Sequence, residues 1–126
     1  MIKVNRLMTN ICSDRLIETR DFYINLFDLT VHYESDWFIQ LISKDKKFEL
    51  GIIDRTNDIV PEDFQKLPQG FYITFVVNDA DEVYEITKKM NYEVVSKPTD
   101  TFYGQRRLLV KDPNGALVDV SSIIKT

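Results

Sequence analysis

The sequence predicts an α+β protein in which a module of one strand, one helix and three further strands occurs twice. Helical patterns begin at residues 13–14 and 78–79, and each is preceded by one strand-like stretch and followed by three. The turn at residues 112–115, Asp-Pro-Asn-Gly, lies between two apolar runs. Because its proline presets φ and its glycine accepts turn backbone angles, the end of the chain is predicted to be a β-hairpin.

In the first half, the alternation predicts a strand over residues 2–12. A helix follows, which Ser13 or Asp14 caps and which ends near Leu29. Apolar side chains recur along this helix at three- and four-residue spacing, so one side of it is buried. Three strands come next, over residues 30–34, 36–43 and 47–54.

The second half follows an Asp-, Asn- and Pro-rich stretch that we interpret as a linker. A strand is predicted over residues 71–77, and a helix with a capping-box-like start at Asp79 ends near Asn91. Then come a strand over residues 92–97, a loop over residues 98–104 and the hairpin, which runs from Gly104 to Val120. The boundaries are module 1 at about 1–55, a linker at about 56–69 and module 2 at about 70–126, all within one domain.

Composition excludes several classes of protein. The chain has 126 residues, 44% of them hydrophobic and 29% charged, which is typical of a globular domain. Its net charge of −4, with no long Lys or Arg run, argues against nucleic acid as a partner. No apolar run is long enough to predict a membrane span or a signal peptide. Cys12 is the single cysteine, so no internal disulfide forms, and we expect a cytoplasmic protein.

Two faces are expected on the predicted sheets. One is purely apolar and suits packing under helices. The other carries Glu49, Tyr72, Thr74 and Asp119, which is too mixed for a core and suits the wall of a cavity. Aromatic side chains in or beside this face can stack on planar or cationic ligands, although they could also be core or dimer-interface residues; they are Trp37, Tyr72, Phe102 and Tyr103.

A resemblance to a known superfamily covers nearly the whole chain. It rests on the order and spacing of Asp14, Phe22-Tyr23, Leu26-Phe27, Trp37, Phe48-Glu-Leu50, the helix entry at Asp79 and the run from Asp112 to Asp119. Together these motifs resemble the vicinal oxygen chelate superfamily, which contains glyoxalases, extradiol dioxygenases, fosfomycin-resistance transferases and bleomycin-resistance proteins. The resemblance implies two βαβββ modules whose strands form one curved, eight-stranded mixed sheet, with helices on the convex face and a ligand site in the cup.

The resemblance also implies where a divalent metal would be held. Enzymes of the superfamily usually supply one ligand each from the first, fourth, fifth and eighth strands. These positions match Leu7 or Met8, Glu49, Tyr72 and Asp119. Two carboxylates without an imidazole are a poor set for Zn, Ni or Fe, so we expect no cofactor, with Glu49 and Asp119 as the candidates should a metal bind. The only histidine, His32, lies away from the matched positions.

The leading functional hypothesis is a metal-independent protein that sequesters an aromatic or cationic compound, similar to bleomycin-resistance proteins that confer antibiotic resistance, and that forms a homodimer. The candidate ligand-binding residues are Asn10, Trp37, Glu49, Tyr72, Phe102, Tyr103, Arg106 and Asp119. One alternative is a metal-dependent lyase, isomerase or dioxygenase, and another is a ligand-free dimer module. In a further reading, the two carboxylates merely pair with Arg106 or Arg107.

Overall fold

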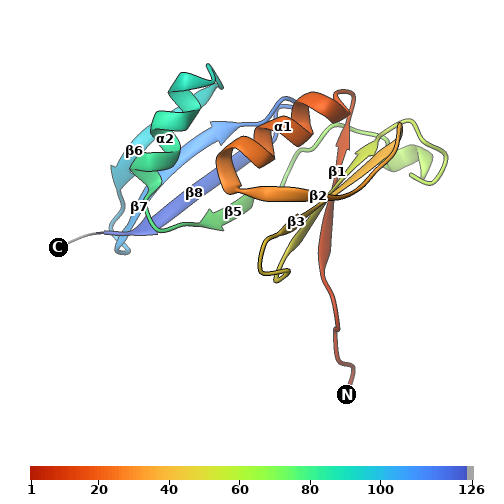
Figure 1. The fold of residues 1–126 in the computed structure, drawn as a ribbon, viewed down its shortest axis with the longest axis horizontal. Coiled ribbons are helices and arrows are strands. Elements are labelled where there is room, and N and C mark those ends of the chain that lie inside the picture. The colour runs from red at the N-terminus through yellow and green to blue at the C-terminus, as the bar shows by residue number, and fades with distance from the viewer. Residues whose placement is uncertain (125–126) are drawn as a thin grey trace. The chain divides into compact units, whose positions relative to one another are not determined.

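The computed structural model describes residues 1–124, and the chain divides into two compact units, Met1–Pro68 and Gln69 onward. We call them the N-terminal and C-terminal units. Each repeats the order strand, helix, three strands. Figure 1 labels all of these elements except β4. The predicted α+β class and the paired βαβββ modules are therefore confirmed.

The N-terminal unit contains a four-stranded sheet with the order β1-β4-β3-β2. β1 runs parallel to β4, and the other neighbours are antiparallel. A short 3-10 helix, Glu62–Phe64, follows the sheet. The elements are β1 (Met8–Ser13), α1 (Leu16–Phe27), β2 (Leu29–Glu34), β3 (Phe38–Ser43) and β4 (Glu49–Asp54).

The C-terminal unit repeats this topology with the order β5-β8-β7-β6, in which β5 is parallel to β8. The elements are β5 (Ile73–Val76), α2 (Ala80–Lys89), β6 (Val94–Asp100), β7 (Gln105–Lys111) and β8 (Leu117–Ile123). The ladder hydrogen bonds thus form two four-stranded sheets instead of the single eight-stranded sheet that the resemblance implied. No helix within residues 1–124 has both the length and the apolar character needed to cross a membrane.

One face of each sheet is covered by the helix of its own unit. α1 packs on β2, β3 and β4, and α2 packs on β6, β7 and β8. The residues between helix and sheet are almost fully buried: Ile11, Phe22, Tyr23, Ile39, Leu41 and Ile52 in one unit, and Ala80, Leu108, Val110, Val118 and Val120 in the other. We call the opposite side of each sheet its open face.

The first strand begins later than predicted, at Met8 instead of residue 2. Met8 pairs with Glu49, which is the first residue of β4, so the β1–β4 ladder begins there. The residues before Met8 remain exposed, including Ile2 and Val4. Alternating residues alone do not form a strand when the partner strand has ended.

The first helix also begins differently. Its N-cap is Arg15, which makes no side-chain cap bond, whereas the sequence predicts capping by Ser13 or Asp14. The Ser13 hydroxyl instead accepts a hydrogen bond from the Arg15 backbone N–H at 2.8 Å, one step before the helix. In the second helix, Asp79 is the N-cap as predicted, and its side chain accepts from the Asp81 N–H.

Two strand boundaries differ from the sequence pattern. Trp37 lies in the turn before β3, where the Ser35 hydroxyl accepts bonds from the backbone N–H groups of Trp37 and Phe38. The predicted loop at residues 98–104 begins late, because β6 continues through Pro98 to Asp100. β6 is an edge strand, where a residue without an N–H is tolerated.

Candidate functional site

The open face of the C-terminal unit carries a buried carboxylate at its centre. Asp119, in β8, is only 6% exposed. Its Oδ1 accepts a hydrogen bond from the Ser121 hydroxyl at 2.8 Å, and its Oδ2 accepts one from the Thr74 hydroxyl at 3.0 Å. The parallel ladder places Thr74 directly beside Asp119. A buried carboxylate needs such partners, because burial without them is costly.

Arg107 is the counter-charge of this carboxylate. Its Nε lies 3.4 Å from Asp119 Oδ2. The guanidinium also lies over Tyr72, with its central carbon 5.8 Å from the ring centroid and Nη2 3.5 Å from the phenol oxygen. β7 pairs Leu109 with Asp119 and Arg107 with Ser121, so Arg107 and Asp119 project from the same face. We call Tyr72, Thr74, Arg107, Asp119 and Ser121 the C-terminal cluster.

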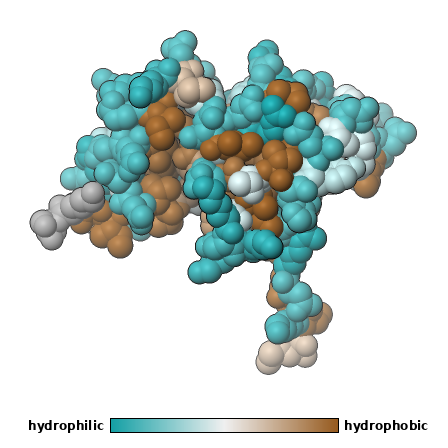
Figure 2. Space-filling model, in the orientation of Figure 1, coloured by the Kyte–Doolittle hydropathy of each residue, from teal (hydrophilic) through white to brown (hydrophobic). Residues whose placement is uncertain are grey.

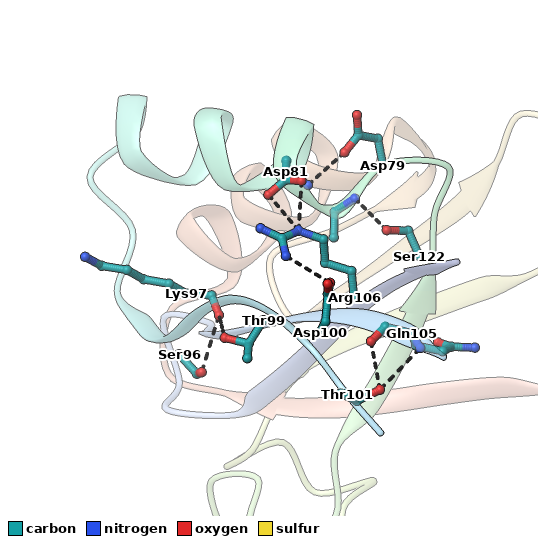
Figure 3. A network of polar contacts seen from close by, with 11 residues as sticks. Asp79, Asp81, Ser96, Lys97, Thr99, Asp100, Thr101, Gln105, Arg106 and Ser122 are labelled. Carbon is teal, nitrogen blue, oxygen red and sulfur yellow. Dashed lines mark hydrogen bonds and ion pairs between the residues drawn. The ribbon is translucent and has the colours of Figure 1, made fainter. Parts of the chain in front are cut away.

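Arg106, the predicted ligand-binding arginine, points to the other side of β7. Its Nε donates to Asp81 at 2.9 Å, and its Nη1 donates to Asp100 at 3.0 Å. Figure 3 shows the guanidinium between these two carboxylates, close to the start of α2. Hydrogen bonds to Asp81 and then to Asp100 raise the pKa of Arg106. The structure therefore places Arg107, and not Arg106, beside Asp119.

A second carboxylate lies on the open face of the N-terminal unit. Glu49 begins β4, and its side chain is 10% exposed. Both of its oxygens accept bonds from one guanidinium, that of Arg6, and the Gln40 amide donates to Oε1. The hydrogen bond from Arg6 lowers the pKa of Glu49 most; Gln40 and the charge of His32 lower it further.

We predict that Arg6→Gln raises the pKa of Glu49 toward its ordinary value of 4.5, because the largest cause of its depression is removed. A depressed carboxyl pKa stabilises the fold above the unfolded-state pKa, and this contribution is lost as pH falls through the folded-state pKa. The stability difference between wild type and Arg6→Gln should therefore shrink in acid. Carbon-13 NMR titration of the Glu49 carboxyl measures the shift directly.

Arg15→Gln is the matched control, since Arg15 forms an exposed ion pair with Glu18 and does not contact Glu49. It should leave the Glu49 titration unchanged. Equal Glu49 pKa values in wild type and Arg6→Gln would show that the Arg6 contact does not persist in solution.

Of the other predicted site residues, three are aromatic and the fourth is Asn10. Asn10 is exposed, on the open face of the N-terminal unit, and its amide lies over Gly51, where a β-carbon would collide with it. The Trp37 ring packs against the Phe38 ring, with 5.8 Å between the ring centroids. Phe102 and Tyr103 contact each other edge-to-face at 5.2 Å in the loop between β6 and β7, and Phe102 is fully exposed.

The donor groups do not suit a metal ion. Within residues 1–124, no three side chains of His, Cys, Asp or Glu lie together as a possible metal site. The oxygens of Glu49 are engaged by Arg6 and Gln40, and those of Asp119 by Thr74, Ser121 and Arg107. The residues beside them in the parallel ladders are Met8 and Thr74, and neither side chain has an imidazole nitrogen.

One protein-family model matches this chain over nearly its whole length. The model of the Glyoxalase/Bleomycin resistance protein/Dioxygenase superfamily matches residues 3–120. A comparison with curated proteins gives no match.

Solved structures share the fold at low identity. A superfamily member from Sphaerobacter thermophilus has a TM-score of 0.78 and 18% identity, covering 97% of this chain and 99% of that one. Lactoylglutathione lyase from Agrobacterium tumefaciens has a TM-score of 0.72 and 18% identity, covering 94% of each chain. Fosfomycin resistance protein FosX from Mesorhizobium loti has a TM-score of 0.69 and 18% identity, covering 98% of this chain and 95% of that one. The matched family model and the repeated βαβββ topology agree, and the chain belongs to the Glyoxalase/Bleomycin resistance protein/Dioxygenase superfamily.

Proposed function

We propose that this chain binds a small aromatic molecule on the open face of its C-terminal unit, and that it does so without a metal ion. The observation that carries the proposal is the half-exposed ring of Tyr72, which lies next to the Arg107 guanidinium above a buried carboxylate. An aromatic ring and a fixed charge at one exposed position can orient a planar ligand. Sequestration of a ligand requires only binding groups of this kind and no catalytic nucleophile.

Metal-dependent lyase, isomerase or dioxygenase chemistry has less support. To bind a metal, Asp119 would have to give up its hydrogen bonds with two hydroxyls and its ion pair with a guanidinium. Glu49 would likewise have to give up its bonds with Arg6 and Gln40. Each carboxylate already has its charge compensated by an arginine. The same compensation removes the main reason to expect a cationic ligand, since Asp119 offers no unpartnered charge.

The proposal includes a homodimer. Large apolar side chains are exposed in both units, and a second copy could cover them. Figure 2 shows apolar atoms at the surface of the segment that leads to the N-terminus, where Ile2 and Val4 lie. In the C-terminal unit the exposed apolar residues include Phe71, Val76, Phe102 and Ile123. Light scattering should give twice the chain mass across a wide dilution range; a monomer throughout would refute this part.

The experiment for ligand binding is an NMR titration of chelator-treated protein with benzamide and other small neutral aromatic compounds. We expect the largest amide shifts at Thr74, Arg107 and Asp119, and we expect Tyr72→Ala to abolish them. Tyr84→Ala is the matched control. Tyr84 also lies beside a cation, with Lys88 Nζ 4.5 Å from its ring centroid, but it is on α2 and not on the open face. Shifts centred on Tyr84, or equal shifts in both variants, would place binding elsewhere.

A further inference from the structure

Asp119 has little capacity to contact a ligand directly. It is 6% exposed, and each of its oxygens already accepts a hydrogen bond, from Ser121 at 2.8 Å or from Thr74 at 3.0 Å. Its negative charge faces Arg107 Nε at 3.4 Å. The carboxylate therefore acts on a ligand only through the guanidinium that it holds.

The guanidinium of Arg107 is held on its inner side and has donors to spare on its outer side. Nε is buried and lies within ion-pair distance of Asp119, yet it makes no hydrogen bond within residues 1–124. On the outer side, Nη2 has one long contact, 3.5 Å to the Tyr72 phenol. A guanidinium carries five N–H donors, so most of its outer edge is free to donate.

The surroundings of this edge suit an anion attached to an aromatic ring. The Arg107 side chain is 28% exposed, which leaves its charge reachable, and the half-exposed Tyr72 ring flanks it. The planar fork of an arginine matches the paired oxygens of a carboxylate, phosphonate or phosphate, and such charge-assisted pairs are stronger than neutral hydrogen bonds. The exposed charge of the C-terminal cluster is thus the cation, not the acid.

We propose that Arg107 binds an oxyanion of the ligand through its outer N–H groups, with Asp119 as the positioning residue that orients the guanidinium and Tyr72 packing against the ligand ring. This inference rests on the proposed function and adds the chemical class of its ligand: a small aromatic carboxylate, phosphonate or phosphate. In the free protein, Asp119 compensates the positive charge of Arg107. It also keeps the outer N–H groups of the Arg107 guanidinium directed away from the sheet.

The test compares three probes, benzoate, phenylphosphonate and neutral benzamide, by calorimetric or NMR titration of chelator-treated protein. Benzoate or phenylphosphonate should bind wild type more tightly than benzamide does, and the tighter of the two identifies the preferred oxyanion. Arg107→Gln should weaken that probe by about tenfold or more, the effect expected when a charge-assisted hydrogen bond is lost. The affinity for benzamide should hardly change.

Two further variants separate binding from folding. Arg107→Lys keeps a positive charge beside Asp119, so it should remain folded while losing affinity for the anionic probe because the planar fork is gone. Lys111→Gln removes a cation from the same strand, where Lys111 pairs with Glu93 at 3.3 Å, and should leave all three affinities unchanged. Thermal unfolding of each variant confirms that the protein compared is folded.

If benzamide binds as tightly as benzoate and phenylphosphonate, and Arg107→Gln and Arg107→Lys change nothing, the oxyanion proposal is wrong. The proposed function would then stand on the Tyr72→Ala result alone. If none of the three probes binds wild type, the proposed function fails and this inference fails with it.

Discussion

Replacing Leu108 by alanine should lower the free energy of unfolding by about 2–5 kcal/mol, the range for removing a large aliphatic side chain from a packed core. Leu108 is fully buried in β7 on the side that α2 covers. Its neighbour Leu109 lies on the open face, opposite Asp119, and is only partly buried. Leu109→Ala should therefore cost less, about 1 kcal/mol.

Denaturant unfolding of the two variants measures this difference, and because the residues are adjacent, strand propensity and chain position are nearly matched. Equal losses would mean that both faces of the C-terminal sheet are packed as core. The assignment of an open face, and with it the placement of the candidate site, would then be wrong.

Asp119→Asn should be the second strongly destabilising change, with a loss of about 2–3 kcal/mol at neutral pH. The amide keeps the shape of the carboxylate, but it leaves Arg107 Nε buried without its counter-charge. Breaking a buried ion pair costs about 3–5 kcal/mol, and the partial exposure of Arg107 reduces that value. A carboxylate that merely lined a pocket would tolerate the amide with little loss.

Asp100→Asn is the control, because Asp100 also pairs with an arginine of β7, Arg106 at 3.0 Å, while its side chain is 55% exposed. Exposed pairs contribute about 0–1 kcal/mol, so this variant should remain near wild type in thermal and denaturant unfolding. In an Arg107→Gln background, Asp119→Asn should cost much less than it does alone. An undiminished cost there would show that the two side chains are not coupled.

The position of Arg107 beside Asp119 could have been predicted from the sequence. The turn at residues 112–115 joins β7 to β8, and this short connection fixes the register of the hairpin. Leu109 then lies opposite Asp119, and the alternation of side chains puts Arg107 on the same face and Arg106 on the other. Sequence patterns near a tight turn therefore carry information about which residues meet.

The pairing of Arg6 with Glu49 could not have been predicted in the same way. β1 and β4 are parallel and are separated by a helix and two strands, so no turn sets their register. The alternation of residues 2–12 is also typical of a single long strand, whereas pairing begins only where β4 begins. In such cases tertiary packing decides which side chains meet, and a local pattern does not reveal it.

Elemental analysis of the protein tests most directly whether binding is independent of a metal ion. The protein should be purified without an affinity tag and without chelator, so that a resident ion is neither added nor removed. We predict Zn, Ni, Mn and Fe far below one atom per chain, because both carboxylates are engaged by arginines and hydrogen-bond donors. Close to one atom of any of these metals per chain would contradict metal-independent binding and favour a metal-dependent enzyme.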